Sequence, residues 1–155
     1  MRKSALLPLL ACVALVALPA ELAGGQRRAS DVRLIAALSG ANEIDPQTGQ
    51  PGAGDPNGYG AASITVRRNR RVCWHIAARQ IDDVVGGHIH QAPAGQNGDI
   101  VVPLFDAADL DPSARGCERV ARSLWRQLRR TPSNFYVNVH TTAFPGGAIR
   151  GQLSR

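Results

Sequence analysis

Three histidines have the residue type and spacing to hold a metal ion: His88, His90 and His140. The short stretch that contains the first two reads as an extended strand, in which residues two apart share one face. The imidazoles of His88 and His90 therefore lie side by side, with Ile89 pointing into the core. Neutral imidazoles are ligands for copper and zinc, and three of them leave one coordination position open. The histidines predict a transition-metal site, with copper favoured over zinc, if His140 lies on a neighbouring strand.

A second strand-like stretch, residues 135–140, supplies the third imidazole. Its apolar side chains are expected on the core face and its polar ones on the opposite face: Phe135, Val137 and Val139 inward, and Tyr136, Asn138 and His140 outward. If the two strands are neighbours, three imidazoles meet on the side of the sheet away from the core. The alternative is a structural network in which the same histidines hydrogen-bond to loop carbonyls.

Three further residues are candidates at the same site. His75 lies one predicted strand earlier and is expected to be either a fourth ligand or an exposed polar residue. Arg150 is expected across the terminal hairpin from Asn138, near His140, where it either attracts an anion or forms a surface ion pair. Glu43, just after the first predicted strand, is expected either to join the site or to have a structural role.

The first residues have the pattern of a secretory signal peptide. Two basic residues precede an apolar run of about 14 residues at 5–18, and a stretch of small residues follows it. Such a run is too short for a membrane span, which needs roughly 20 residues. The sequence therefore predicts three parts: a signal peptide at 1–23, a leader at 24–31 and one domain at 32–155. The mature chain is expected in the periplasm or outside the cell.

Removal of the predicted signal peptide changes both the cysteine count and the charge of the chain. Cys12 leaves with the signal peptide, so Cys73 and Cys117 remain and are expected to form one disulfide. Removal of residues 1–23 takes away Arg2, Lys3 and Glu21, which leaves 16 of the 18 basic residues against 11 of the 12 acidic ones, a formal charge of about +5. A basic chain can bind an acidic surface or an extracytoplasmic protein, or present a solvated basic face. The sequence contains no recognisable nucleic-acid-binding motif.

Short alternating stretches separated by Gly- and Pro-rich turns predict an all-β domain. Strands are expected near residues 32–38, 62–66, 72–78, 88–91, 100–105, 135–140 and 148–153. Residues 41–59 are expected to be a long surface loop, and residues 106–116 to be irregular. One helix is expected at about 121–130, where Leu124 and Leu128 recur at i and i+4. Together these elements predict an antiparallel, Greek-key-like β-sandwich with one short helix.

Four ordered stretches resemble the CHRD domain, a module first described in chordin and widespread in exported bacterial proteins. They are Leu38–Glu43, His88–His90 with Gly95–Gly98 and Ile100–Val102, Tyr136–Thr141, and Pro145–Leu153. The resemblance runs from about Arg33 to Leu153, nearly the whole predicted domain. It implies an extracytoplasmic β-sandwich and says little about activity, because the bacterial members are mostly of unassigned function.

A second likeness is to the copper side of Cu/Zn superoxide dismutases, which are also β-sandwiches. A His-x-His pair at a strand end, a later strand that ends in histidine and a late arginine are similar. By that likeness His88, His90 and His140 would hold copper, and Arg150 would attract an anion. The sequence departs from those enzymes because it lacks the bridging histidine and the long zinc-bearing loop. In addition, only ten residues separate His140 from Arg150.

Three functions remain open for this sequence. The favoured one is an exported CHRD-type binding module, not an enzyme, that holds one copper or zinc ion through the three histidines. The second is a copper-dependent oxidoreductase of dismutase type with the same ligands, in which Arg150 steers superoxide. The third is a structural or protein-interaction domain without a metal. No nucleophile–histidine–carboxylate pattern is detectable, so a hydrolase is not expected.

Overall fold

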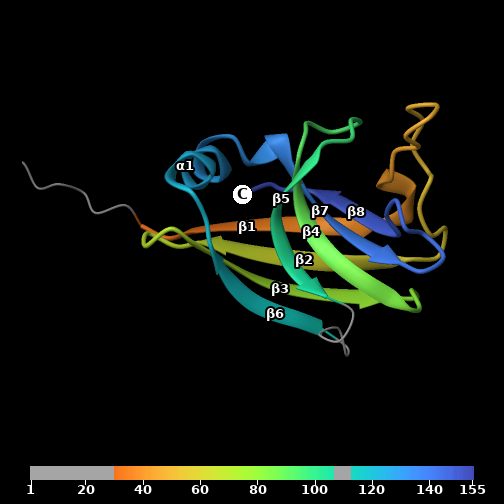
Figure 1. Cartoon of the computed structure of the whole chain (residues 1–155), viewed down its shortest axis with the longest axis horizontal. Coiled ribbons are helices and arrows are strands. Elements are labelled where there is room, and N and C mark those ends of the chain that lie inside the picture. Colours follow the sequence, from red (N-terminus) through yellow and green to blue (C-terminus); the bar gives the residue numbers. More distant parts are fainter. Residues whose placement is uncertain (1–29, 107–112) are drawn as a thin grey trace, which may run out of the picture.

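The computed structural model of the chain describes residues 30–106 and 113–155. Within them, eight antiparallel strands form one sheet in the order β5-β4-β7-β8-β1-β2-β3-β6, accompanied by one α-helix (Figure 1). The strands are β1 (Val32–Ser39), β2 (Tyr59–Val66), β3 (Arg71–Arg79), β4 (Val84–Gln91), β5 (Asp99–Asp106), β6 (Ser113–Arg119), β7 (Phe135–Thr141) and β8 (Ile149–Gln152). The predicted signal peptide and most of the predicted leader lie outside the described residues.

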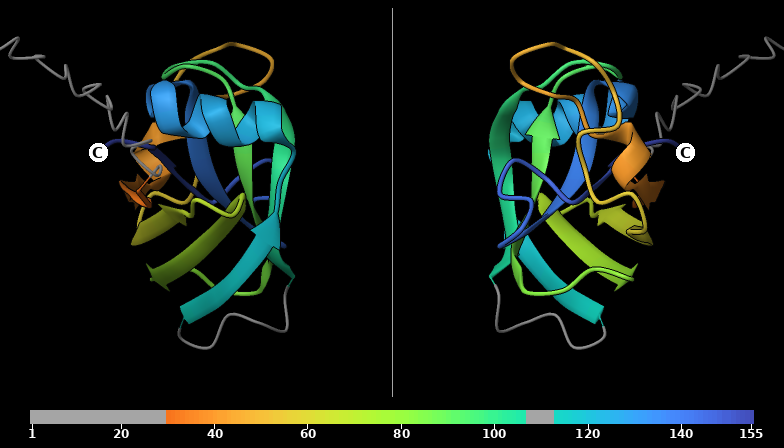
Figure 2. Two further views of the ribbon diagram at one scale, coloured as in Figure 1. Left: turned by 90° about the vertical axis from the view of Figure 1, so that its left-hand side faces the viewer. Right: turned by 90° about the vertical axis from the view of Figure 1, so that its right-hand side faces the viewer.

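The sheet curls so strongly that its two halves face each other across one core (Figure 2). One half contains β1, β2, β3 and β6, and the other contains β5, β4, β7 and β8. The two edge strands, β5 and β6, lie next to each other, so the sheet is nearly closed. The predicted class, an antiparallel all-β fold with one short helix, is confirmed, and its two layers are the halves of a single sheet.

Alternation of apolar and polar residues determines which face of each strand is buried. Leu34 on β1 lies opposite Ile64 on β2, which in turn lies opposite Trp74 on β3. Leu34 and Ile64 are fully buried, whereas Ile35 on the other face of β1 is half exposed. The first three strands therefore turn the predicted apolar face toward the core.

Helix α1 (Arg122–Arg130) lies across one end of the curled sheet (Figure 2). Leu128 on its inner face is fully buried in the core, and Leu124 one turn earlier packs against the same cluster. Arg129 and Arg130 lie in the last turn, where the helix dipole favours positive charge. The predicted helix at 121–130 is confirmed. None of the described helices is long and apolar enough to cross a membrane.

The prediction of an irregular segment at 106–116 is wrong from Ser113 onward. Strand β6 begins there and pairs with β3 along its whole length. Ala114 is its one fully buried apolar side chain, so the strand has almost no apolar alternation to reveal it. Cys117 lies directly opposite Cys73 in this pairing, and the two form the predicted disulfide.

The outer face of β7 is covered, although its polar residues were expected to face solvent. All seven residues of β7 are buried, because two loops fold over this side of the sheet. The loop after β1 contacts the loop before β8, where the Asp55 amide donates to the Ala148 carbonyl at 2.9 Å. These loops form a second, polar layer outside the sheet. The predicted site lies between this layer and the sheet.

Candidate metal centre

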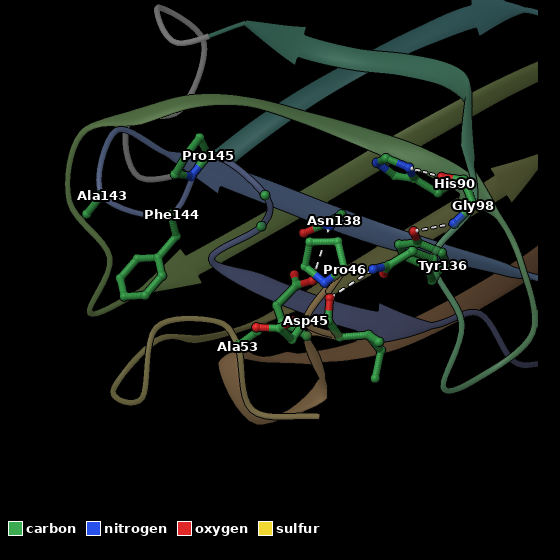
Figure 3. A pocket seen from close by; sticks show the side chains of 15 residues that line it. Asp45, Pro46, Ala53, His90, Gly98, Tyr136, Asn138, Ala143, Phe144 and Pro145 are labelled. Carbon is green, nitrogen blue, oxygen red and sulfur yellow. Dashed lines mark hydrogen bonds between the residues drawn. The ribbon is translucent and has the colours of Figure 1, made fainter. Parts of the chain in front are cut away.

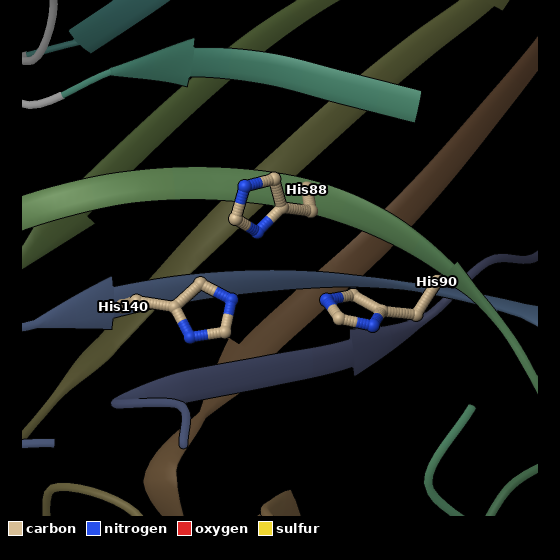
Figure 4. A group of neighbouring side chains, drawn as sticks. All are labelled: His88, His90 and His140. Atoms are coloured by element: carbon tan, nitrogen blue, oxygen red, sulfur yellow. The ribbon is translucent and has the colours of Figure 1, made fainter. Parts of the chain in front are cut away.

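The three histidines meet on the face of β4 and β7 that is opposite the core (Figure 4). His88 and His90 lie two residues apart on β4, and Ile89 between them is fully buried. β7 is the hydrogen-bonded neighbour of β4, and His140 lies opposite Gly86 in their register. One ligand atom from each histidine lies within 4.8 Å of the other two. Adjacent strands thus bring together the three residues that the sequence singled out.

Two backbone carbonyls determine which ring nitrogens carry hydrogen. Nδ1 of His90 lies 2.9 Å from the carbonyl oxygen of Gly98, and Nδ1 of His140 lies 3.1 Å from that of Pro145. A carbonyl oxygen only accepts hydrogen bonds, so both Nδ1 atoms are donors. In a neutral ring each Nε2 then carries the lone pair that a metal ligand needs.

Three of the four remaining ring nitrogens are buried and have no hydrogen-bond partner among the described residues. They are Nδ1 of His88, Nε2 of His90 and Nε2 of His140, and the rings are directed toward one another (Figure 4). Buried polar atoms in proteins are almost always paired, so three such nitrogens close together are suited to share one ligand. Three imidazole nitrogens fit one copper or zinc ion and leave one coordination position open.

Burial keeps these imidazoles neutral at pH 7. Burial, and after it repulsion from His88, lowers the pKa of His140 to about 4 from an ordinary value of 6.5. Burial also lowers the pKa of His88 and that of His90. A cation that enters the site at neutral pH therefore meets lone pairs and does not have to displace protons.

His75 does not join the cluster. It lies on β3, and β8, β1 and β2 separate that strand from β7. Its neighbours in the register are Ser63 on β2 and Arg115 on β6. The structure therefore places His75 on the other half of the sheet and does not make it a fourth ligand.

Arg150, Tyr136 and His90 form a stack on the same face of the sheet. The guanidinium carbon of Arg150 lies 3.4 Å from the centroid of the Tyr136 ring, and the His90 ring is nearly parallel to Tyr136 at 4.9 Å. Gly98 connects two members of this stack. Its carbonyl accepts from His90, and its amide donates to the Tyr136 hydroxyl at 3.2 Å. The turn that contains Gly98 therefore orients His90.

Arg150 lies opposite Asn138 in the register of β7 and β8, as the sequence predicted. Its side chain is only 2% exposed. The guanidinium donates to Oδ1 of Asn97 at 2.9 Å and to the carbonyl of Gln96 at 2.6 Å. These contacts hold the turn against the sheet, which supports a positioning role. Steering of an anion from solvent would instead need an exposed guanidinium, and this one is buried.

Glu43 is a site residue whose role the sequence left open. It is 3% exposed, and Nδ2 of Asn138 donates to its Oε2 at 3.4 Å. Burial raises the pKa of Glu43 to about 7, although Arg150 and Asn138 favour the ionised form. A short 3-10 helix, Gly40–Asn42, turns the chain back over the sheet after β1 and brings Glu43 to this position. The carboxyl thus belongs to the polar layer beside the histidines.

Gly147 permits the close approach of Glu43 and Asn138. A Cβ atom at this position would lie 2.5 Å from Oε1 of Glu43 and 2.6 Å from Nδ2 of Asn138. Its φ of +144° is also in the region that side chains disfavour. Only glycine fits here, because the backbone itself forms one wall of the carboxyl–amide contact.

We expect Arg150→Lys to lower the free energy of unfolding by about 2 kcal/mol. Lysine keeps the charge but cannot form the paired contacts to Asn97 and Gln96, which leaves acceptors without a partner. Denaturant unfolding at neutral pH measures the change. Arg33→Lys is the control, since this exposed arginine makes a single side-chain contact, to Ser63, and the expected change is below about 0.5 kcal/mol. Equal effects of the two substitutions would contradict the positioning role.

We expect Glu43→Gln to change how stability depends on pH in the metal-free protein. The pKa of Glu43 is about 7 in the folded state and 4.5 as its ordinary value, so folding favours the protonated form. The stability that this protonation adds to the folded state is fully present below pH 4.5, and it is lost as the pH rises through 7. The free energy of unfolding of the parent protein, minus that of the variant, should therefore fall by about 3 kcal/mol from about pH 4 to about pH 8.

Unfolding curves at several pH values test the effect of Glu43→Gln. The histidines titrate in both proteins, so their contribution cancels in the difference. Glu118→Gln, at an exposed carboxyl on β6, is the matched control. If the free energies of unfolding of the parent and of Glu43→Gln differed by the same amount at every pH, the carboxyl would not be held in its protonated form.

The comparison with known protein families accounts for most of the chain. Residues 34–153 match the CHRD domain. This range contains the three histidines, Glu43 and Arg150, so the candidate site lies entirely within the domain. No curated protein and no solved structure matches the chain significantly. Since the match spans well over half of the 155 residues, the chain belongs to the CHRD domain family.

Proposed function

We propose that this chain is an exported CHRD binding module that holds one transition-metal ion, copper in preference to zinc. The ligands are Nδ1 of His88, Nε2 of His90 and Nε2 of His140. The observation that carries the proposal is the meeting of three buried, unpaired imidazole nitrogens at one point. When bound, the ion would present one open coordination position to water or to a small ligand.

The preference for copper follows from the donor set. Imidazole suits both copper and zinc, but sites made of nitrogen ligands bind copper(II) more tightly than zinc(II). The carbonyls of Gly98 and Pro145 hold two of the rings in the tautomer that a metal requires. The tautomers of these two rings are therefore set before the ion enters, and the three rings, whose ligand atoms lie within 4.8 Å of one another, would close around it.

Binding is favoured over catalysis because of Arg150. In a dismutase-type enzyme this residue would attract superoxide from solvent, but here its side chain is buried and its guanidinium donates to Asn97 and Gln96. A purely structural role for the histidines is also less favoured. Such a role would pair the inward nitrogens, and these have no partner among the described residues.

Export is part of the proposal. It is supported by the signal-like first residues and by the disulfide between Cys73 and Cys117, which persists in oxidising compartments. The periplasm and the medium outside the cell both fit. The excess of arginine over acidic residues would suit a partner with an acidic surface in either place.

Metal titration of the purified oxidised protein tests this function. We expect one equivalent of copper(II) to bind in competition with a chelator of known affinity, and zinc(II) to bind more weakly. A superoxide assay on the copper-loaded protein separates a binding module from an enzyme, and the module predicts no activity above that of free copper. Failure to bind either ion stoichiometrically would overturn the proposal.

A further inference from the structure

A cavity of about 460 Å³ lies beside the histidines, on the outer side of β7 (Figure 3). His90 is the one proposed metal ligand that lines it. Apolar walls come from the loops that cover the sheet, among them Ile44, Pro46 and Phe144. This volume is in the range of small-molecule sites, which are mostly apolar with a few polar groups that set orientation.

Besides Nε2 of His90, two polar atoms of residues that line the cavity have no partner among the described residues. They are Oε1 of Glu43 and Oδ1 of Asn138. The two side chains are 3% and 2% exposed, and both residues line the cavity. The contact between Asn138 Nδ2 and Glu43 Oε2 uses the other atom of each group. Two buried oxygen atoms are thus free. Oδ1 of Asn138 is an acceptor at any pH, and Oε1 of Glu43 is an acceptor when the carboxyl is ionised, so both would be stabilised by a donor.

The charges around the cavity favour a neutral occupant. Glu43 supplies at most one negative charge, and Arg150 is close enough to interact with it. A cationic occupant would meet repulsion from Arg150. An anionic one would be repelled by Glu43 and would find few free donors, because the amide of Gly98 already donates to Tyr136. The lining therefore selects an uncharged molecule that donates hydrogen bonds.

We propose that this cavity binds a small neutral molecule whose hydroxyl or amide N–H groups donate to Glu43 and Asn138. Its apolar ring or short chain packs against Phe144 and Pro46. The inference goes beyond the metal site and does not depend on it, because neither acceptor is a metal ligand. Where a metal is bound, the His90 ring would lie between the metal ion and the small molecule.

Resorcinol is a suitable probe, because it is small, neutral at pH 7, carries two hydroxyl donors and does not chelate metals. Its matched control is 1,3-difluorobenzene, which has a similar shape but no donor. We expect resorcinol, titrated into metal-free protein, to shift the amide NMR signals of residues 43–45, 143–144 and 146–147. The difluoro compound at the same concentration should bind at least roughly tenfold more weakly. Equal binding of both compounds, or binding of neither, would overturn the inference.

Substitutions locate the probe. Phe144→Ala should weaken resorcinol binding roughly tenfold through lost apolar contact. Val85→Ala removes a half-exposed apolar side chain elsewhere and should leave binding unchanged. Unchanged binding in Phe144→Ala would contradict the site. Because the titration uses metal-free protein, failure of the metal proposal would leave these results intact.

Discussion

Replacement of His140 by alanine is expected to lower the affinity of the chain for copper(II) about 1,000-fold, or about 4 kcal/mol of binding free energy. Loss of a partner that only orients a ligand typically costs 10- to 100-fold, and here a ligand itself is removed. His140 is also the one ligand contributed by β7, so His88 and His90 on β4 would have to hold the ion alone. Competition with a chelator at about pH 7.5 measures the change.

His75→Ala is the matched control for this experiment. It removes the remaining histidine of the chain, on β3, and should leave copper affinity unchanged. His140→Gln is a second variant that fills the same space, in case the alanine variant fails to fold. If copper affinity fell equally in the β3 and β7 variants, or in neither, the ion would not be bound where the three rings meet.

Removal of the disulfide is expected to lower the free energy of unfolding by about 4 kcal/mol. The bond joins Cys73 and Cys117 across a separation of 44 residues. Cross-linking such a long loop lowers the conformational entropy of the unfolded chain, and the bond also holds the edge strand β6 to β3. The double variant Cys73→Ala, Cys117→Ala, compared with the oxidised parent by denaturant unfolding, tests the expectation.

Reduction of the parent protein with a thiol provides an internal control for the cysteine variant. The reduced parent and the double alanine variant should unfold at similar denaturant concentrations, because both lack the same covalent link. A loss of less than about 1 kcal/mol in both would show that the bond adds little to what strand pairing already provides.

The strands with clear alternation could be predicted from the sequence because one face of each packs on a single core. That rule placed Ile89 inward and the flanking histidines outward, and it placed His140 on the same side from the pattern of β7. The convergence of the rings then needed only that β4 and β7 be neighbours. Strand order, however, is a long-range property that no local pattern contains.

The covering of β7 could not be predicted, because alternation describes only the face toward the core. Tyr136 and Asn138 were expected on the surface, and both are 2% exposed. They are buried by loops rich in glycine and proline, whose composition predicts turns but not what the turns contact. Glu43 and the turn around Gly98 were thus visible in the sequence, but their contacts with the site were not.

Strand β6 was missed for a different reason. Its sequence, Ser-Ala-Arg-Gly-Cys-Glu-Arg, has no β-branched or aromatic side chain, and such residues are the usual signal of a strand. Gly116 is needed because a Cβ there would lie 2.3 Å from the indole ring of Trp74. This segment is therefore a strand because it pairs with β3 and is linked to Cys73. The β-propensity of its own residues would not predict one.

The near closure of the sheet has a consequence for the protein as a solute. A free sheet edge is a template on which another molecule can add a strand, and such contacts lead to aggregation. Here β5 carries the exposed Pro103, which has no amide hydrogen to donate, and β6 carries exposed charges at Arg115, Glu118 and Arg119. Each edge also lies beside the other. We therefore expect the protein to stay dispersed at high concentration, an asset in compartments without ATP-driven chaperones.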